Sequence, residues 1–301
     1  MVVVAVASRT ALGALPAPGM LDAPCPVMPA RPAELDAQTE LDLRPERPDR
    51  AGSARTLEPA TRAYLAALDQ QRKGDWAGRC RFQTDDAVIA RGSAARVEFL
   101  GDSITENWLL ADPSFFTGGI VNRGISGQTS PQMLVRFYAD VVALHPGLVH
   151  IMAGTNDLAG NTGPTSAQQY ENNIMAMCDL ARANGIQVVL ASIPPAATFP
   201  WRSELRPGRQ IAALNAWLRR YAAQRRLISV DYYAELADKG GAMRADLSHD
   251  GVHPQRAGYA LVRPLAERAI AAASGGRYLT ALRDQASQLW EQRRTMGAIN
   301  M

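Results

Sequence analysis

Cysteine, lysine and long apolar runs are scarce in this sequence of 301 residues. Three cysteines with no CxxC pair do not make a disulfide framework. Lysine occurs only at Lys73 and Lys239, so the net charge of +3 rests on arginine. No stretch reaches the roughly 18 apolar residues that a membrane-spanning helix needs. We therefore expect a soluble protein without a membrane span, and 47% apolar content is enough for a sizeable core.

The arginines do not indicate a nucleic-acid partner. They lie among acidic and apolar residues, which is typical of a solvated helix face rather than of a phosphate-binding surface, as at Arg219, Arg220, Arg225 and Arg226. The scarcity of lysine beside abundant alanine, arginine, glycine and proline indicates a bias in codon usage. We expect no binding of DNA or RNA.

The cysteines and the first residues bear on location. Cys178 falls on the apolar stripe of a predicted helix and is expected in the core, whereas Cys25 and Cys80 can form a bridge only if the chain is exported. The start, MVVVAVA, is similar to the apolar part of an export signal but lacks its positive charge and its length. It is either a signal remnant or the result of a misplaced start codon. We favour a periplasmic or secreted location over a cytoplasmic one.

Composition divides the chain into four segments. Residues 1–56 are rich in proline, alanine, arginine and acids without sustained periodicity, which predicts a flexible leader. Residues 57–93 are expected to form a helical extension, and residues 94–274 the main domain. The tail, 275–301, contains an amphipathic helix that either packs on its own domain or forms a homodimer contact.

The main domain alternates short apolar runs with longer amphipathic segments. Predicted strands are 96–100, 119–122, 147–153, 186–192 and 227–231. Helices are predicted at 165–184, at 208–224 and after Pro254. This alternation predicts an α/β fold: a three-layer α/β/α sandwich around a five-stranded parallel sheet.

A serine stands where the first predicted strand ends. Ser103 lies in the tetrapeptide GDSI, three residues after Leu100. In an open parallel sheet, ligands bind beyond the carboxyl ends of the strands. A serine hydroxyl becomes a good nucleophile only when a base removes its proton, so an imidazole is needed nearby.

The chain offers four histidines as that base. His150 lies inside a predicted strand and is interpreted as structural, while His145 precedes Pro146 at the start of that strand, the wrong end for catalysis. His253 has the better context, because Asp250 on the same turn can accept the other imidazole N–H and fix its tautomer.

His249 and His253 also have the spacing of a metal-binding pair on a helix. Gly251 and Pro254 argue against a helix there, and no third ligand or general-base glutamate accompanies them. We expect no metal.

Two further segments at predicted strand ends can donate hydrogen bonds to an oxyanion. The glycines of NRGISGQT, residues 122–129, let the backbone N–H approach a ligand closely. In GTND, residues 154–157, the Asn156 amide can donate. Alone each motif is weak, since glycine and Asn-Asp usually mark turns or helix caps. Their order along successive strands is the stronger signal.

These four motifs together resemble the SGNH, or GDSL, hydrolase superfamily. Its blocks read here GDSIT at 101–105, NRGISGQTS at 122–130, GTND at 154–157 and DGVHP at 250–254, and the resemblance covers about 94–274. The second block is most similar to the branch that contains platelet-activating-factor acetylhydrolase catalytic subunits and bacterial arylesterases. This resemblance implies a flavodoxin-like sheet, an esterase activity and no metal or other cofactor.

The resemblance also implies residue roles. Ser103 would be the nucleophile, with His253 and Asp250 completing the triad. The Ser103 N–H, the Gly127 N–H and the Asn156 side chain would form the oxyanion hole. Asp102, next to the nucleophile, cannot easily reach the imidazole nitrogen held by Asp250, so we expect it to serve the hydrogen bonding of the loop.

The substrate is less defined by the sequence. Trp108, Phe199 and Trp201 can line an acyl or alcohol subsite, or pack in the core. A small pocket favours acetyl and other short acyl esters. Lysophospholipase, thioesterase and carbohydrate deacetylase activities use the same machinery, and a noncatalytic protein that binds acylated glycans is a further alternative.

Overall fold

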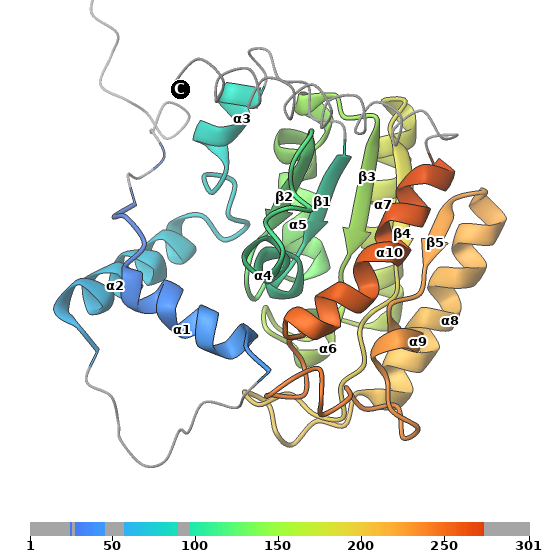
Figure 1. Cartoon of the computed structure of the whole chain (residues 1–301). Helices are drawn as coiled ribbons and strands as arrows, with labels where there is room; N and C mark the ends of the chain where they lie inside the picture. The colour runs from blue at the N-terminus through green and yellow to red at the C-terminus, as the bar shows by residue number, and fades with distance from the viewer. Residues whose placement is uncertain (1–24, 26–27, 46–56, 90–96, 274–301) are drawn as a thin grey trace, which may run out of the picture.

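A computed structural model describes Cys25 and residues 28–45, 57–89 and 97–273 (Figure 1). Five parallel strands form one sheet in the order β2-β1-β3-β4-β5. They are β1 (Val97–Gly101), β2 (Ile120–Gly124), β3 (Leu148–Met152), β4 (Gln187–Ala191) and β5 (Ile228–Val230). The predicted five-stranded parallel sheet is confirmed, and its strand order is flavodoxin-like.

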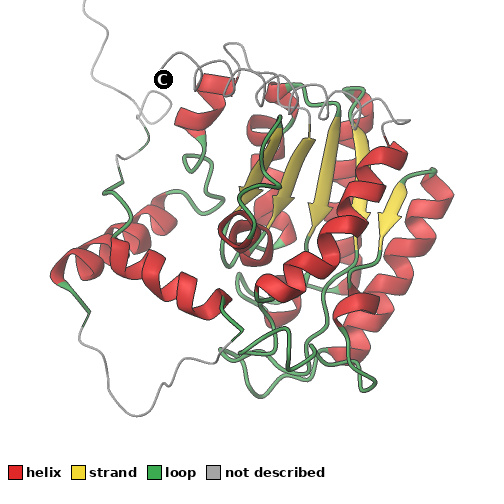
Figure 2. Cartoon of the chain, viewed as in Figure 1, coloured by secondary structure: helices red, strands yellow, loops and turns green. Residues whose placement is uncertain are grey.

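Helices cover both faces of the sheet, which confirms the three-layer sandwich (Figure 2). One face carries α5 (Ser130–Asp140), α7 (Ala167–Ala183) and α8 (Gly208–Arg225). The other carries α4 (Ser103–Ala111) and α10 (Arg256–Ala273). Shorter helices are η1 (Val142–Leu144), α6 (Thr155–Ala159) and α9 (Tyr233–Leu236). None of the helices within the described ranges has the length and apolar character to cross a bilayer.

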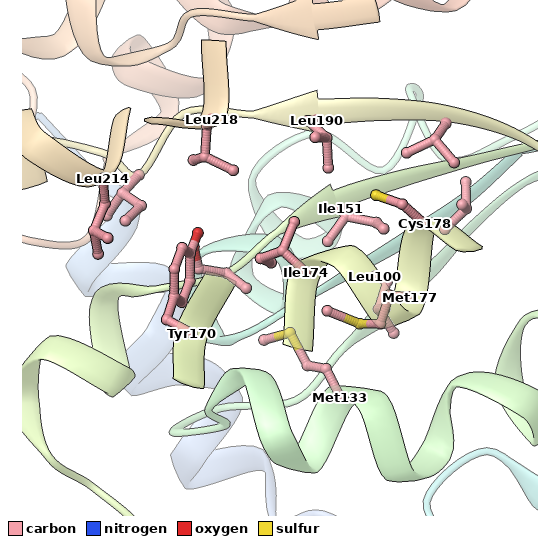
Figure 3. Close-up of a cluster of buried hydrophobic side chains, with 14 of the residues drawn as sticks. Leu100, Met133, Ile151, Tyr170, Ile174, Met177, Cys178, Leu190, Leu214 and Leu218 are labelled. Carbon is pink, nitrogen blue, oxygen red and sulfur yellow. The ribbon is translucent and has the colours of Figure 1, made fainter. Parts of the chain in front are cut away.

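Strand side chains alternate between two cores. Leu100 and Leu190 face the layer of α5, α7 and α8, whereas Phe99 and Val189 face α4 and α10. In the first core, side chains from the helices interdigitate with those from β1, β3 and β4 (Figure 3). Cys178 lies in this core, as predicted.

The second core is aromatic around Trp108. This side chain is 1% exposed, and its ring stacks on Phe115 at 5.1 Å and meets Phe99 edge-on at 5.8 Å. The prediction that Trp108 lines a substrate subsite is therefore wrong. The reason is geometric: Trp108 lies one turn into α4, on the face that this helix presses against the sheet.

A buried ion pair holds the carboxyl ends of β1 and β2 together. Arg136 of α5 is 0% exposed and bonds Asp140 Oδ2 at 2.8 Å. Its guanidinium also donates to the carbonyl oxygens of Gly101 and Arg123 and to Gln128 Oε1, at 3.2, 2.7 and 2.6 Å. Burial raises the pKa of Asp140, although the charge of Arg136 opposes the shift.

The N-terminal part contains three helices, α1 (Ala33–Leu43), α2 (Pro59–Gly74) and α3 (Gln83–Ile89). The helix predicted near residue 57 is thus present, but the prediction of a flexible leader is wrong for Ala33–Leu43. The sequence of α1 has no marked apolar periodicity; its stability comes from docking, since Leu43 is buried in the second core. A disulfide joins Cys25 and Cys80. The amphipathic helix expected in 275–301 lies outside the described residues.

Candidate active site

Ser103 lies where β1 ends and α4 begins. The Asp102 side chain caps α4 by accepting the Ile104 N–H at 2.9 Å. This bond is of the kind expected for Asp102, which was predicted to serve the hydrogen bonding of the loop. Between β1 and β3 the strand order reverses direction, and Ser103 and Asn156 follow these two neighbouring strands. This is the crevice in which sheets of this topology bind ligands.

The structure brings Ser103, His253 and Asp250 together. Ser103 Oγ lies 2.8 Å from His253 Nε2, and His253 Nδ1 lies 2.7 Å from Asp250 Oδ2. The other carboxylate oxygen of Asp250 accepts the backbone N–H groups of Val252 and His253 at 2.9 and 2.8 Å. Gly251, with φ of +76°, allows this tight turn, because residues with a side chain rarely adopt that conformation. The imidazole orientation is therefore fixed by the turn that carries it.

The charges of this turn shift the pKa values of His253 and Asp250. Burial would lower the pKa of His253, but the hydrogen bond and the negative charge of Asp250 outweigh it, so the pKa is raised. Burial also opposes ionisation of Asp250. Its hydrogen bonds with the imidazole and with backbone N–H groups nevertheless hold the pKa of this carboxyl well below its usual range. Asp250 is thus an anion throughout the neutral range.

Backbone donors lie beside Ser103. Gly127 has φ of +82°, which favours glycine, and it lines the same cavity as Ser103. Neither the Ser103 N–H nor the Gly127 N–H bonds another of the residues that the structure describes. The loop before Gly127 is held by α4, because Glu106 Oε2 accepts the Ser126 N–H at 2.8 Å. Two N–H groups are thus available to a ligand oxygen.

Asn156 lies in the same cavity but its amide is engaged. Nδ2 donates to Asp102 Oδ2 at 3.1 Å and to the Gln128 carbonyl at 3.0 Å. Both amide hydrogens therefore have partners within the protein. Burial raises the pKa of Asp102 to about 6, so the carboxylate that Asn156 contacts is protonated in mild acid.

Asn161 and Trp201 extend this network to the cavity rim. Asn161 Nδ2 donates to Asn156 Oδ1 at 2.7 Å and to the Gly127 carbonyl at 3.2 Å, and Asn161 Oδ1 accepts the Trp201 indole N–H at 3.0 Å. The Trp201 ring lies 6.1 Å from the His253 ring. Sequence reasoning missed Asn161, since it lies four residues beyond the GTND motif with no pattern of its own.

The cavity around these groups has a volume of about 550 Å³. Trp201, 42% exposed, lines it as predicted. Phe199 is 0% exposed and does not line it, so this prediction is wrong: Phe199 packs in the first core and stacks on Trp201 from behind at 5.4 Å. Of the three aromatic residues proposed for the subsite, Trp201 is the one that lines this cavity.

A further wall of the cavity, formed by residues of α1 and α2, was not predicted from the sequence. Thr39, Asp42 and Leu43 of α1 and Arg72 of α2 line the cavity. No motif marks them, because they belong to helices whose position relative to the sheet is set by tertiary contacts.

The other histidines have separate partners. His150 is buried in β3 with Nε2 3.0 Å from the Tyr232 hydroxyl, and burial lowers its pKa to about 3, so its interpretation as structural fits its surroundings. His249 Nε2 donates to the Arg44 carbonyl at 2.7 Å. His249 and His253 lie in a loop and point to different partners. Among the described residues, no group of three or more histidine, cysteine or acidic side chains could hold a metal.

A parallel sheet with this strand order, a hydrogen-bonded Ser-His-Asp chain and backbone donors at its carboxyl edge are the arrangement of a hydrolase. The chain belongs to the GDSL-like lipase/acylhydrolase family, whose model matches residues 99–261. It is therefore a carboxylic ester hydrolase by family, as the resemblance implied.

Three proteins illustrate the relationship. A GDSL-like lipase from Bacteroides thetaiotaomicron is 42% identical over 65% of this chain and 98% of its own, with a TM-score of 0.63. Esterase TesA from Pseudomonas aeruginosa is 30% identical over 52% of this chain and 73% of its own. An uncharacterised lipoprotein from Bacillus subtilis, YqeF, is 35% identical over 25% of this chain and 32% of its own.

Proposed function

We propose that the protein is a serine esterase that hydrolyses short-chain acyl esters, preferably acetyl esters, through an acyl-enzyme on Ser103. The observation that carries this proposal is the unbroken hydrogen-bonded chain from Ser103 Oγ through His253 to Asp250, which opens on the cavity. A serine next to an oriented imidazole is the arrangement that activates the hydroxyl.

In the first step His253 Nε2 accepts the Ser103 proton while Oγ attacks the ester carbonyl. The tetrahedral intermediate collapses when the C–O bond to the alcohol breaks and His253 returns the proton to the leaving oxygen. In the second step His253 accepts a proton from water, the hydroxide attacks the acyl carbon, and Ser103 Oγ leaves with that proton. The Asp250 anion stabilises the imidazolium in both steps.

The Ser103 and Gly127 N–H groups are proposed to donate to the oxyanion. Asn156 would join them by exchanging one of its present partners, Asp102 or the Gln128 carbonyl, for the developing charge. Hydrogen bonds in unliganded sites often tighten only when substrate is bound. Because Asn161 bonds both Asn156 and the Gly127 carbonyl, it would hold the Asn156 and Gly127 donors in a fixed position relative to each other.

The lining of the cavity supports a short acyl group. Among the described residues that line it, the apolar side chains are Leu43, Trp201 and Pro254, and the others are polar, charged or glycine. A long fatty acyl chain binds well only where a continuous apolar groove removes it from water. The lining therefore favours esterase over lysophospholipase activity. An acetylated carbohydrate suits the same polar surface.

An extracytoplasmic location is part of the proposal. The Cys25–Cys80 disulfide persists only in an oxidising compartment. The partial likeness to a lipoprotein agrees with that location.

A series of p-nitrophenyl esters from acetate to dodecanoate tests the acyl preference. We expect kcat/KM to fall about tenfold or more between butyrate and octanoate, because each further methylene must be placed in a polar cavity. Labelling by a fluorophosphonate, followed by peptide mapping to Ser103, is measured in parallel. Rising kcat/KM with chain length would contradict the short-chain preference, and absent labelling would contradict the serine mechanism.

The pH profile tests the role of His253. Only the neutral imidazole accepts the Ser103 proton, and Asp250 raises the His253 pKa above its ordinary value of 6.5. Activity should therefore rise with pH through a midpoint above that value and level off under mildly alkaline conditions. In Asp250→Asn the residual activity should show a midpoint at lower pH, because the anion is gone. A profile that rises on acidification below about pH 5 would exclude His253 as base.

A further inference from the structure

Residues 75–82 form the loop between α2 and α3, and this loop packs against the segment that carries the Gly127 N–H (Figure 1). The loop precedes the family-matched residues, which begin at residue 99. Its residues all belong to the described part of the chain, and none of them lines the cavity that contains Ser103. An effect of loop 75–82 on catalysis must therefore pass through the residues that it contacts.

A buried carboxylate shapes loop 75–82 from within. Asp75 is 7% exposed, and its side chain accepts the backbone N–H groups of Arg79 and Cys80 at 2.9 and 2.8 Å. The Asp75 carbonyl accepts the Gly78 N–H at 3.0 Å, which closes a turn. Cys80 is also joined to Cys25 by the disulfide. These contacts hold the loop in one conformation without involving the active site.

A buried hydrogen bond joins this loop to the residue after Gly127. Gln128 Nε2 donates to the Ala77 carbonyl at 2.7 Å, and Gln128 Oε1 accepts from Arg136 at 2.6 Å. The Gln128 residue is 3% exposed. A buried amide that is bonded through both its oxygen and its nitrogen has little freedom to move, because any shift leaves a polar group unpaired. The position of Gln128 therefore depends on Ala77.

Close packing joins the two segments at a second point. Gly78 has φ of +69°, and a methyl group built on it would lie 3.1 Å from both Ile125 Cδ1 and Gln128 Nε2. Ile125 and Gln128 flank Ser126 and Gly127 in the sequence. The backbone of loop 75–82 thus lies against both ends of the segment that carries the Gly127 N–H, and an alanine at Gly78 would displace one of its neighbours.

A charged pair connects the loop to Ser126. Arg81 lies 3.4 Å from Glu106 Oε1, and Glu106 Oε2 accepts the Ser126 N–H at 2.8 Å. The Ser126 hydroxyl donates to the same carboxylate oxygen. Helix α4 and loop 75–82 therefore support the segment before and after Gly127 together.

The Gly127 N–H can assist the reaction only if it is correctly placed. Negative charge develops on the former carbonyl oxygen in the tetrahedral intermediate, and a donor stabilises this charge when it is already aimed at that position. A backbone donor has no side-chain rotamer to adjust, so its placement is that of the segment that carries it. Loss of support for this segment is expected to weaken binding of the transition state more than binding of the substrate.

We propose that loop 75–82 positions the oxyanion hole, with Ala77 and Gly78 holding the Gly127 N–H in place through Gln128 and Ile125. These four are positioning residues, because they act through Gly127. The inference rests on the proposed esterase mechanism, and it adds the support that the oxyanion hole of that mechanism requires. It gives a part in catalysis to a segment outside the family-matched residues.

Gly78→Ala tests this by inserting one methyl group at the contact. In the full-length protein, kcat for p-nitrophenyl acetate should fall about tenfold while KM changes less than about twofold. Inhibition by trifluoroacetone should weaken by about the same factor as kcat falls. Ser103 Oγ adds to its carbonyl carbon, His253 takes the proton, and the carbonyl oxygen becomes an oxyanion, as in the transition state.

Gly185→Ala is the matched control. Gly185 has φ of +70°, so alanine there meets the same backbone strain, but its methyl group has no atom within 4 Å. Its kcat, KM and inhibition by trifluoroacetone should equal those of the wild-type protein. The comparison separates contact with the oxyanion segment from the strain of a left-handed alanine.

Two further variants test the same contact from different sides. Gly78→Ala with Ile125→Val should recover part of kcat and of the inhibitor affinity, because valine lacks the Cδ1 atom that the methyl group meets. Asp75→Ala loosens the loop without adding bulk and should also lower kcat at nearly constant KM. Asp75→Asn keeps an acceptor oxygen and should recover part of that loss. Circular dichroism checks the fold of each variant.

The outcomes distinguish this inference from the esterase proposal. Equal kcat in Gly78→Ala and Gly185→Ala would overturn it, as would a fall in kcat without a matching loss of affinity for trifluoroacetone. In either case turnover and fluorophosphonate labelling of the wild-type protein leave the esterase proposal standing. Absent turnover and labelling in the wild-type protein would overturn both.

Discussion

Ser103→Ala is expected to lower kcat for p-nitrophenyl acetate by about 10⁴- to 10⁶-fold. The substitution removes the hydroxyl oxygen that lies 2.8 Å from His253 Nε2 and leaves the backbone N–H in place. Alanine is also well tolerated in the first turn of α4, so thermal unfolding should be little affected. Steady-state kinetics on highly purified protein, with circular dichroism as the check on folding, measures both quantities.

The controls separate the hydroxyl from the fold. Ser229→Ala removes an exposed hydroxyl on the edge strand β5 and should retain full activity. The combination of Ser103→Ala with His253→Ala should be no slower than either single variant, because the two groups act as a unit. Turnover by Ser103→Ala at the wild-type rate would exclude the acyl-enzyme on this residue.

Arg136→Met is expected to lower the free energy of unfolding by about 3–5 kcal/mol. The methionine retains much of the side-chain volume but removes the cation that faces Asp140, whose side chain is 1% exposed. It also removes three hydrogen bonds to Gly101, Arg123 and Gln128. Denaturant unfolding followed by fluorescence gives the change in stability.

A surface ion pair supplies the comparison. Arg225 and Asp179 are 39% and 59% exposed, so Arg225→Met should cost less than about 1 kcal/mol. Arg136→Met combined with Asp140→Leu should recover part of the loss, because no uncompensated charge then stays buried. Equal destabilisation by Arg136→Met and Arg225→Met would show that burial of the pair does not set its contribution.

The strands and the reacting groups were predictable because local signals mark them. The central strands β1 and β3 are short runs buried on both faces, and the motifs that contain Ser103 and Asn156 stand at their carboxyl ends, so parallel topology alone brings these two residues together. The turn from Asp250 to His253 carries its own glycine and proline signals. These features depend on residues close together in sequence.

The walls of the cavity were not predictable in the same way. Trp108 and Trp201 are the same type of residue, and only packing decides that Trp108 is buried while Trp201 is exposed to the cavity. Helix α1 lacks a marked apolar stripe, and its attachments lie far along the chain. Asn161 is held in the site by hydrogen bonds with three residues, and no sequence pattern connects it with them. Where position depends on tertiary contacts, propensity and periodicity give no signal.

The Glu40–Arg256 ion pair joins residues 216 positions apart, and Ser103 meets its imidazole across 150 positions. During synthesis helix α1 leaves the ribosome long before Arg256 has been translated. In the proposed mechanism, a chain arrested before residue 250 would hold Ser103 without its proton acceptor, so hydrolytic capacity would arise only when translation of the domain is nearly complete.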